Sequence, residues 1–224
     1  MKSNKKILII RFNAIGDVVM STIIPFSIKL RHSASEIHYL TSKNNAKMLK
    51  NCSYIDKIIP FNGNISGTIK ELFKQRYDCI ICLNYTLKSY LFTFLSFPKR
   101  IIFKSFKGTS WVENYFNTAK ELYNDLVMPN RLCMHNEDFK SKYHVLKIIN
   151  KYPKPHILIN PGRLYNQIRQ GRVWNIEKYM ELSKKLLKMY GGTIFVNGSI
   201  SERDYHMLLA DKNIVILTGM YNLV

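Results

Sequence analysis

Short runs of β-branched and other apolar residues alternate with amphipathic segments along the first hundred residues. The runs KILIIRF, EIHYLT, IDKIIPF, YDCIICLN and KRIIFK predict strands. The segments between them have helical apolar spacing, at residues 18–30, 43–51, 65–75 and 87–96. Strands that alternate with helices in this order predict a parallel sheet with helices on both faces. Two further helices are predicted, over residues 110–122 and 140–151.

The alternation starts again after a proline-punctuated segment, KYPKP. The runs HILINPG, GTIFVNG and NIVILTG predict three more strands, with helices over residues 176–190 and 201–210. We therefore predict an α/β protein of two Rossmann-like lobes, residues 1–150 and 155–224, with a cleft between them. A doubly wound lobe usually has five or six strands, so we expect the second lobe to be incomplete or the chain to be part of a longer one.

The charge balance narrows the choice of partner. The chain has 34 Lys and Arg against 15 Asp and Glu, a net charge of +19, which favours nucleic acid, a phosphorylated lipid, an acidic sugar or a nucleotide. Compositional bias of the genome is the competing explanation. The 46% hydrophobic content is enough for a real core. The longest apolar stretch, YLFTFLSF, is too short to span a bilayer and no signal peptide is visible, so we expect a cytoplasmic protein, soluble or peripheral to the membrane.

The cysteines and histidines do not form a metal site by their spacing. Cys79 and Cys82 have CxxC spacing, but they lie inside a predicted buried strand, where side chains three apart point to opposite faces. We expect structural thiols in a reducing compartment. The six histidines are scattered, so no metal is expected. The turn after the first strand has a single glycine, which disfavours a dinucleotide and leaves no cofactor predicted.

The segment RFNAIGDVVMSTIIP, at the end of the first strand, contains the first candidate for chemistry. Asp17 lies where the strand turns into a helix. One interpretation is an acidic residue that only stabilises the helix N-terminus. The other is the acid that a reaction needs. Gly16 before it permits either an unusual backbone conformation or the close approach of a ligand.

Four segments, in order along nearly the whole chain, resemble the ADP-heptose:lipopolysaccharide heptosyltransferases of glycosyltransferase family 9. They are KILIIRFNAIGDVVMSTIIPFSIKLR, YDCIICLNYTLKSYLF, LINPGRLYNQIRQGRVWNIEKYMEL and TIFVNGSISERD. The family's strand, glycine–aspartate turn and helix with an early proline are matched by Gly16, Asp17 and Pro25. The resemblance implies a GT-B fold and metal-independent sugar transfer with inversion.

The sequence departs from the family pattern at two places. Cys82 and Asn84 stand where the family has an acid and a glutamine. The family's later donor-site loop, of Asp-Ser/Thr-Gly-Pro-x-His type, has no counterpart before residue 224, so the resemblance implies a C-terminally truncated member. That departure bears on donor binding and on turnover.

In the first lobe, the resemblance implies that Asp17 is the general base that removes the acceptor's proton. Gly16 and Lys88 are then acceptor-binding candidates. Basic residues and aromatics interleave from Leu87 to Trp111. This stretch suits an acidic glycolipid at an anionic membrane surface, a nucleic acid, or a solvated face with no partner, and the resemblance favours the glycolipid.

In the second lobe, the resemblance implies a site for the donor, a nucleotide-diphosphate sugar. Arg172, where the family usually has lysine, would stabilise the leaving diphosphate, and Gly162 would let the backbone pass near it; a surface arginine and a plain turn are the alternatives. Glu202 would hold ribose hydroxyls or else form a capping box with Ser199. Trp174 is predicted to pack in the core.

The sequence therefore predicts an inverting glycosyltransferase that moves heptose from ADP-heptose onto a lipopolysaccharide or lipooligosaccharide core, at the inner membrane's cytoplasmic face. Three alternatives stay open. They are another nucleotide sugar, a non-catalytic homologue acting as a binding or scaffold protein, and a basic nucleic-acid-binding module.

Overall fold

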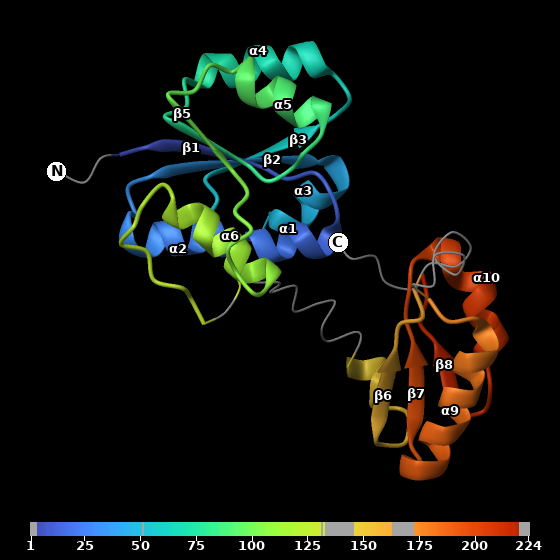
Figure 1. Ribbon diagram of the computed structural model, residues 1–224. Helices are drawn as coiled ribbons and strands as arrows, with labels where there is room; N and C mark the ends of the chain where they lie inside the picture. The colour runs from blue at the N-terminus through green and yellow to red at the C-terminus, as the bar shows by residue number, and fades with distance from the viewer. Residues whose placement is uncertain (1–3, 51, 131, 133–145, 163–172, 220–224) are drawn as a thin grey trace. The chain divides into compact units, whose positions relative to one another are not determined.

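A computed structural model describes residues 4–50, 52–130, 132, 146–162 and 173–219 of the chain. It divides into two compact units, Met1–Glu137 and Asp138–Val224, so that the division lies ahead of the KYPKP segment (Figure 1). Each unit has its own parallel sheet. The α/β class and the two Rossmann-like units follow the prediction from sequence.

The first unit is built on a five-stranded parallel sheet. Its strands are β1 (Lys6–Ile10), β2 (Glu36–Ser42), β3 (Lys57–Phe61), β4 (Cys79–Cys82) and β5 (Arg100–Phe103). They lie in the order β3-β2-β1-β4-β5, so the chain runs outward from β1 in one direction and then returns to continue from β4 in the other. The carboxyl ends of β1 and β4 therefore form the topological switch point, where ligands bind in open α/β sheets.

Helices cover both faces of this sheet (Figure 1). They are α1 (Ile15–Ser21), α2 (Ile23–Arg31), α3 (Lys43–Leu49), α4 (Ile65–Gln75), α5 (Leu87–Phe94) and α6 (Trp111–Lys120). One apolar core joins α1, α2, α3 and α6 to one face, and a second core joins α4 and α5 to the other. Alternate strand residues feed the two cores, as Ile7 and Leu8 do.

The helix predicted over residues 18–30 is two helices, α1 and α2, separated at Thr22. Pro25 has no N–H to donate to the carbonyl of Ser21, and its ring crowds that carbonyl. The break at Thr22 follows from this lost hydrogen bond, which the prediction of one continuous helix overlooked.

The second unit has a three-stranded parallel sheet of β6 (His156–Ile159), β7 (Thr193–Val196) and β8 (Ile214–Ile216), in that order. Helix α9 (Ile176–Tyr190) has the predicted bounds. The single helix predicted over residues 201–210 is wrong. In its place lie three short elements. They are the 3₁₀ helix η1 (Ile200–Glu202), the α-helix α10 (Arg203–His206) and the 3₁₀ helix η2 (Met207–Leu209). Residues 146–149 are helical, and the earlier part of the helix predicted over 140–151 lies outside the described residues.

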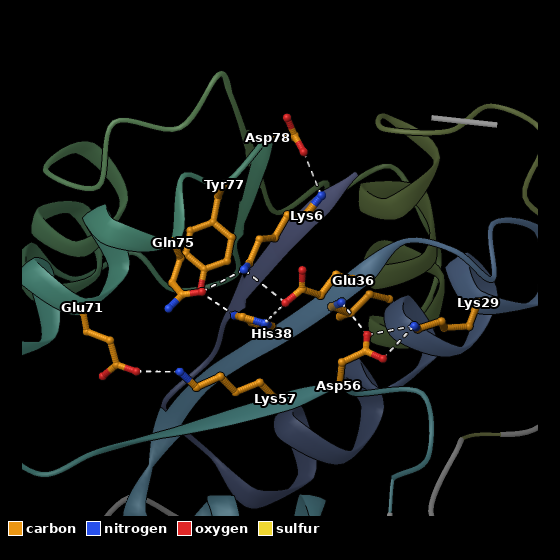
Figure 2. Close-up of polar contacts among 11 residues, drawn as sticks. Lys6, Lys29, Glu36, His38, Asp56, Lys57, Glu71, Gln75, Tyr77 and Asp78 are labelled. Atoms are coloured by element: carbon orange, nitrogen blue, oxygen red, sulfur yellow. Dashed lines mark hydrogen bonds and ion pairs between the residues drawn. The ribbon is translucent and has the colours of Figure 1, made fainter. Parts of the chain in front are cut away.

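Paired charges occupy the amino-terminal end of the first sheet (Figure 2). The Glu36 carboxylate lies 3.1 Å from the Lys6 ammonium and 2.7 Å from Nε2 of His38. Nδ1 of buried His38 lies 2.8 Å from the Tyr77 hydroxyl. Further ion pairs join Lys29 to Asp56, Lys57 to Glu71 and Lys99 to Asp78. This end of the sheet is closed by polar contacts within the protein.

Candidate active site

The turn that follows β1 lies at the switch point of the first sheet. β1 pairs with β2 on one side and β4 on the other, and the N–H of Arg11 continues the β1–β2 ladder to Leu40. Residues 13–16 are exposed, and α1 begins at Ile15. The turn thus projects from the sheet where two crossovers diverge.

Two buried amides hold the chain as it leaves β1. The N–H of Phe12 donates to Oδ1 of Asn84 at 2.7 Å, and the Phe12 carbonyl accepts from Nδ2 of Asn45 at 2.6 Å. Asn84 follows β4, so it ties the carboxyl ends of β1 and β4 together. Asn84 therefore fixes the position of the turn.

Asp17 is the carboxylate of this turn, and three groups hold it. Arg11 forms an ion pair with Oδ2, the Tyr115 hydroxyl donates to Oδ1 at 3.1 Å, and the Ala14 N–H lies 3.3 Å from Oδ2. The contact with Ala14 is the carboxylate half of a capping box for α1. Asp17 therefore stabilises the N-terminus of α1, which is the first of the two interpretations from the sequence. Its carboxylate also lies at the switch point of the sheet.

The electrostatic environment keeps Asp17 ionised. Burial acts to raise its pKa, but the charge of Arg11 and hydrogen bonds from Ala14, Arg11 and Tyr115 outweigh it, so the pKa lies below 3.8. The Asp17 side chain is 25% exposed, which leaves it open to a ligand. Arg11 also donates to the carbonyl of Leu83 at 2.6 Å, and its Nε is buried without a partner among the described residues.

Two lysines near this end of the sheet are held by aromatic rings. The ammonium of Lys104, just after β5, lies 3.6 Å from the centre of the Trp111 ring and 5.4 Å from that of Tyr115. Lys88 lies 4.2 Å from the ring centre of Phe12. Within the described residues, neither ammonium has a carboxylate at ion-pair distance.

Lys104 is buried, and its ammonium feels the charge of Arg11. Burial and then the repulsion from Arg11 lower the pKa of Lys104, while Asp17 partly offsets both. Cation–π contacts stabilise such a charge but do not neutralise it. The switch point therefore has an excess of positive charge that suits an anionic ligand.

Gly16 leaves open space beside Asp17. A Cβ at this position would meet no atom of the protein within 4 Å. Its backbone is not left-handed, so the unusual conformation offered as one reason for this glycine does not apply. Acceptor binding at Gly16 stays a prediction.

The second unit gathers its candidates at the carboxyl ends of β6 and β7. Gly162 has φ of +79°, and its N–H lies 3.3 Å from Oδ1 of Asn160, so a turn accounts for this glycine without a ligand. Oε2 of buried Glu202 accepts from the Ser199 N–H at 2.6 Å in a capping box. A Cβ on Gly198 would collide with Glu202 and with His206. Donor binding by Gly162 and Glu202 stays a prediction.

The loop after Gly162 is only partly described. Arg172, with Arg163 and Arg169, lies outside the described residues, so its donor role also stays a prediction. Trp174 is 51% exposed and lies 5.6 Å from the Tyr179 ring, so its predicted place in the core is wrong. The Tyr179 hydroxyl donates to the carbonyl of Pro161 at 3.2 Å, which connects α9 to the strand-ending turn.

Cys79 and Cys82 are buried in β4 as free thiols, as predicted from their strand. Burial raises the pKa of Cys79 to about 12 and raises that of Cys82 as well. Among the described residues, no group of three His, Cys, Asp or Glu side chains is placed to hold a metal ion. In the same residues we find no helix with the length and apolar character needed to cross a bilayer.

Sequence reasoning missed Arg11 and Tyr115, and it placed Lys104 only within the basic and aromatic stretch from Leu87 to Trp111. Arg11 and Lys104 had a usable signal, because each directly follows a strand at the end where parallel sheets bind ligands. Tyr115 had none, since it lies 98 residues beyond Asp17 and reaches it only when α6 packs on α1 and α2.

The chain is similar to solved structures of glycosyltransferases. A glycosyl transferase family 9 protein from Veillonella parvula matches with a TM-score of 0.75 and 16% identity, over 98% of this chain and 71% of that one. The E. coli ADP-heptose lps heptosyltransferase II matches with a TM-score of 0.73 and 18% identity, over 97% and 74%. The E. coli heptosyltransferase WaaC with ADP matches with a TM-score of 0.67 and 14% identity, over 96% and 75%.

No protein-family model matches the sequence, and no curated protein matches it either. Identities this low establish the fold alone. The resemblance found in the sequence is confirmed at that level. The chain has the GT-B-like fold of the family 9 glycosyltransferase and heptosyltransferase structures.

Proposed function

We propose that the protein is an inverting glycosyltransferase that moves heptose from ADP-heptose onto the acidic core of a lipopolysaccharide or lipooligosaccharide. One observation carries the proposal. In a fold shared with heptosyltransferases, Asp17 lies at the switch point, ionised and partly exposed beside open space at Gly16.

The chemistry is a single displacement. The acceptor hydroxyl oxygen attacks the anomeric carbon as the bond from that carbon to the diphosphate oxygen breaks on the opposite face. The hydroxyl proton passes to Asp17. Because its pKa is low, the carboxylate is a weak base towards the free hydroxyl and becomes effective only as bond formation acidifies that proton.

The acceptor side of the proposal rests on the excess of positive charge near Asp17. Lys88, with Lys104, would hold acidic groups of the acceptor. Carboxylates and phosphates of a lipid-linked sugar match such unpaired ammonium groups. The protein would act where that lipid is, at the cytoplasmic face of an anionic membrane.

The donor side rests on the second unit. Gly162, Arg172 and Glu202 are the proposed contacts to the nucleotide sugar. Gly162 and Glu202 lie beyond β6 and β7, at the carboxyl ends where α/β sheets bind phosphates. A structural neighbour, the E. coli heptosyltransferase WaaC, was solved with ADP, which makes ADP the nucleotide to test first.

The decisive experiment compares the protein with its Asp17→Asn variant. Transfer from ADP-heptose to a deacylated acidic core is expected to fall by about 10²–10⁴-fold, because the amide cannot accept the proton. Calorimetry should find ADP bound equally by both. Wild-type protein that binds ADP and acceptor but transfers nothing would contradict the proposal, as would a variant within a few-fold of wild type.

A binding or scaffold protein without turnover is the second candidate. Both Asp17 oxygens already have donors within the protein, which is the arrangement a purely structural carboxylate would have. Acceptor binding in calorimetry with no turnover of any nucleotide sugar would favour this candidate.

A further inference from the structure

Helix α5 has its polar and apolar faces reversed relative to a normal surface helix. Its buried positions include Ser89 and Thr93, with Ser96 just beyond its end, all at most 1% exposed. Its exposed positions are apolar, with Leu87 at 77% and Phe94 at 52%. A helix that covers a sheet normally points its apolar stripe inward.

The outward residues follow the helical repeat, so they share one face. Leu87 and Phe94 are seven residues apart, and partly buried Tyr90 and Leu91 lie between them on the same side. Phe97, after the helix, is 72% exposed and has a left-handed φ of +47°. A bulky aromatic side chain is rarely found in that conformation, so it is a strained residue presented to solvent.

The inner face explains how α5 packs without an apolar stripe. The hydroxyl of Thr93 donates to the Ser89 carbonyl at 2.8 Å, and that of Ser96 to the Phe92 carbonyl, so the helix satisfies its own polar groups. Phe92 is the large apolar residue of α5 in the core beneath. Packing in the first unit therefore does not require the outward Leu87 side chain, and Phe94 contributes a tilted ring contact, with its ring centre 6.2 Å from that of Phe103. Contiguous exposed apolar faces of this kind mark interaction sites.

The charges around this face identify the kind of partner. The sequence has no Asp or Glu between residues 79 and 112, and two exposed basic residues, Lys99 and Arg100, follow Phe97 closely. Lys99 also pairs with Asp78, just before β4. Lys74 and Arg76 are exposed at the end of α4, where the Phe73 ring contacts that of Phe97. A second copy of the chain would bring the same positive charge to this face, so self-association is opposed by repulsion.

We propose that the outer face of α5, together with Phe97, binds an anionic lipid bilayer. An eight-residue helix is about 12 Å long, so it lies along the interface and does not cross it. Leu and Phe side chains enter the acyl boundary while the lysines stay with anionic headgroups. This inference deepens the proposed function, because it assigns the surface on which the lipid-linked acceptor arrives.

Vesicle co-sedimentation tests the proposal without any nucleotide sugar. The probes are vesicles of phosphatidylglycerol and phosphatidylcholine in equal parts, and vesicles of phosphatidylcholine alone. The double variant Leu87→Ser/Phe94→Ser is expected to bind the mixed vesicles at least about tenfold more weakly than wild type. Leu30→Ser is the matched control. Leu30 is 55% exposed on α2, over the opposite face of the sheet, and its variant should bind like wild type.

Phe97→Gly separates membrane binding from folding. Glycine adopts the left-handed backbone without strain, which offsets its greater freedom in the unfolded chain and the lost contact with Phe73, so this variant should stay folded and yet bind vesicles more weakly. A merely structural role for Phe97 predicts no loss of vesicle binding.

Three results of the vesicle and sedimentation experiments would overturn the assignment, and a competition experiment gives a fourth. They are equal binding to the two kinds of vesicle at low salt, unchanged binding by the double variant, and a wild-type dimer in sedimentation velocity that the double variant dissolves. Random oligonucleotides that compete at physiological salt would point to nucleic acid and also overturn it. Transfer to the deacylated core is measured separately, so a failed membrane assignment and a failed glycosyltransferase assignment give different results.

Discussion

The two ends of the first sheet use the same residue types in opposite ways. At the amino-terminal end, Lys6 and Lys57 each contact a carboxylate (Figure 2), and so does Lys99. At the carboxyl end, Lys88 and Lys104 face aromatic rings, and no carboxylate of the described residues lies at ion-pair distance from them. The lysines of the amino-terminal end are thus paired with carboxylates, whereas the carboxyl end has positive charge with no carboxylate partner among the described residues.

This contrast indicates that the amino-terminal end of the sheet contributes to stability and that the carboxyl end is suited to ligand binding. Charges already paired inside the protein gain little from a bound anion, whereas the ammonium groups of Lys88 and Lys104, which have no carboxylate partner among the described residues, can gain one. The substitutions below act on one end at a time.

The largest contrast is expected between two aspartates, Asp17 at the carboxyl end and Asp56 at the amino-terminal end. Asp17→Asn should remove transfer and leave the protein folded, although it loses the charge that pairs with Arg11. Asp56→Ala should leave transfer unchanged and lower stability, because it removes the acceptor of the Ile37 N–H, 2.6 Å away, and the partner of Lys29. We expect the free energy of unfolding to fall by about 1–2 kcal/mol in urea titrations, with kcat unchanged. An equal loss of transfer in the two variants would remove the contrast.

Lys104→Met removes an unpaired charge and keeps the volume of the side chain. The charged form is disfavoured by burial and by Arg11, and it is favoured by the aromatic rings around it, so the free energy of unfolding should change by less than about 1 kcal/mol. The KM for an acidic acceptor should rise about tenfold. An unchanged KM alongside a large stability loss would make Lys104 a structural residue.

Gly16→Ala tests the open side of Asp17. The added methyl meets no protein atom, and alanine favours the helix, so the variant should be as stable as wild type or more stable by about 0.5 kcal/mol. If the acceptor passes there, kcat/KM falls by about tenfold or more. Thermal unfolding and steady-state kinetics on one preparation separate the two effects, and full activity would place the acceptor elsewhere.

Tyr115→Phe has the smallest expected effect at neutral pH. Removing this donor raises the pKa of Asp17. The depressed pKa of Asp17 stabilises the fold above pH 3.8, and this stabilisation is lost as the pH falls through the pKa of the folded state. The acid limb of the kcat/KM profile should therefore move to higher pH. Carbon-13 titration of the Asp17 carboxyl gives the same shift without turnover, and an unmoved carboxyl titration would exclude this role for Tyr115.

Local sequence pattern was sufficient for most of the fold. Helices α4 and α9 have their predicted bounds, since each combines a clear apolar stripe with a terminal signal, Asn64 before α4 and Gly191 after α9. The helix predicted over residues 201–210 failed because tertiary contacts override local propensity. Nδ1 of buried His206 lies 2.7 Å from Oγ1 of Thr218, twelve residues further along the chain.

The candidate site was predictable only where its parts are close in sequence. Asp17 and Gly16 stood out in one turn. The hydrogen bond from Tyr115 depends on the packing of α6. The aromatic rings around Lys104 come from a loop and a helix, and the apolar spacing of the sequence does not predict that they lie near Asp17. Arg172 lies outside the described residues, so its proposed role in donor binding is tested by activity and ADP binding and not by geometry.

The two amides that grip Phe12 set a sharp boundary in the chain. Both backbone groups of Phe12 are buried and bonded, whereas residues 13–16 are exposed. Amide hydrogen exchange at Phe12 should then require opening of the sheet itself, while the neighbouring amides exchange through local motion. A ligand that binds to the turn needs to order only residues 13–16. The loss of conformational entropy on binding is therefore confined to a short segment that directly follows buried Phe12.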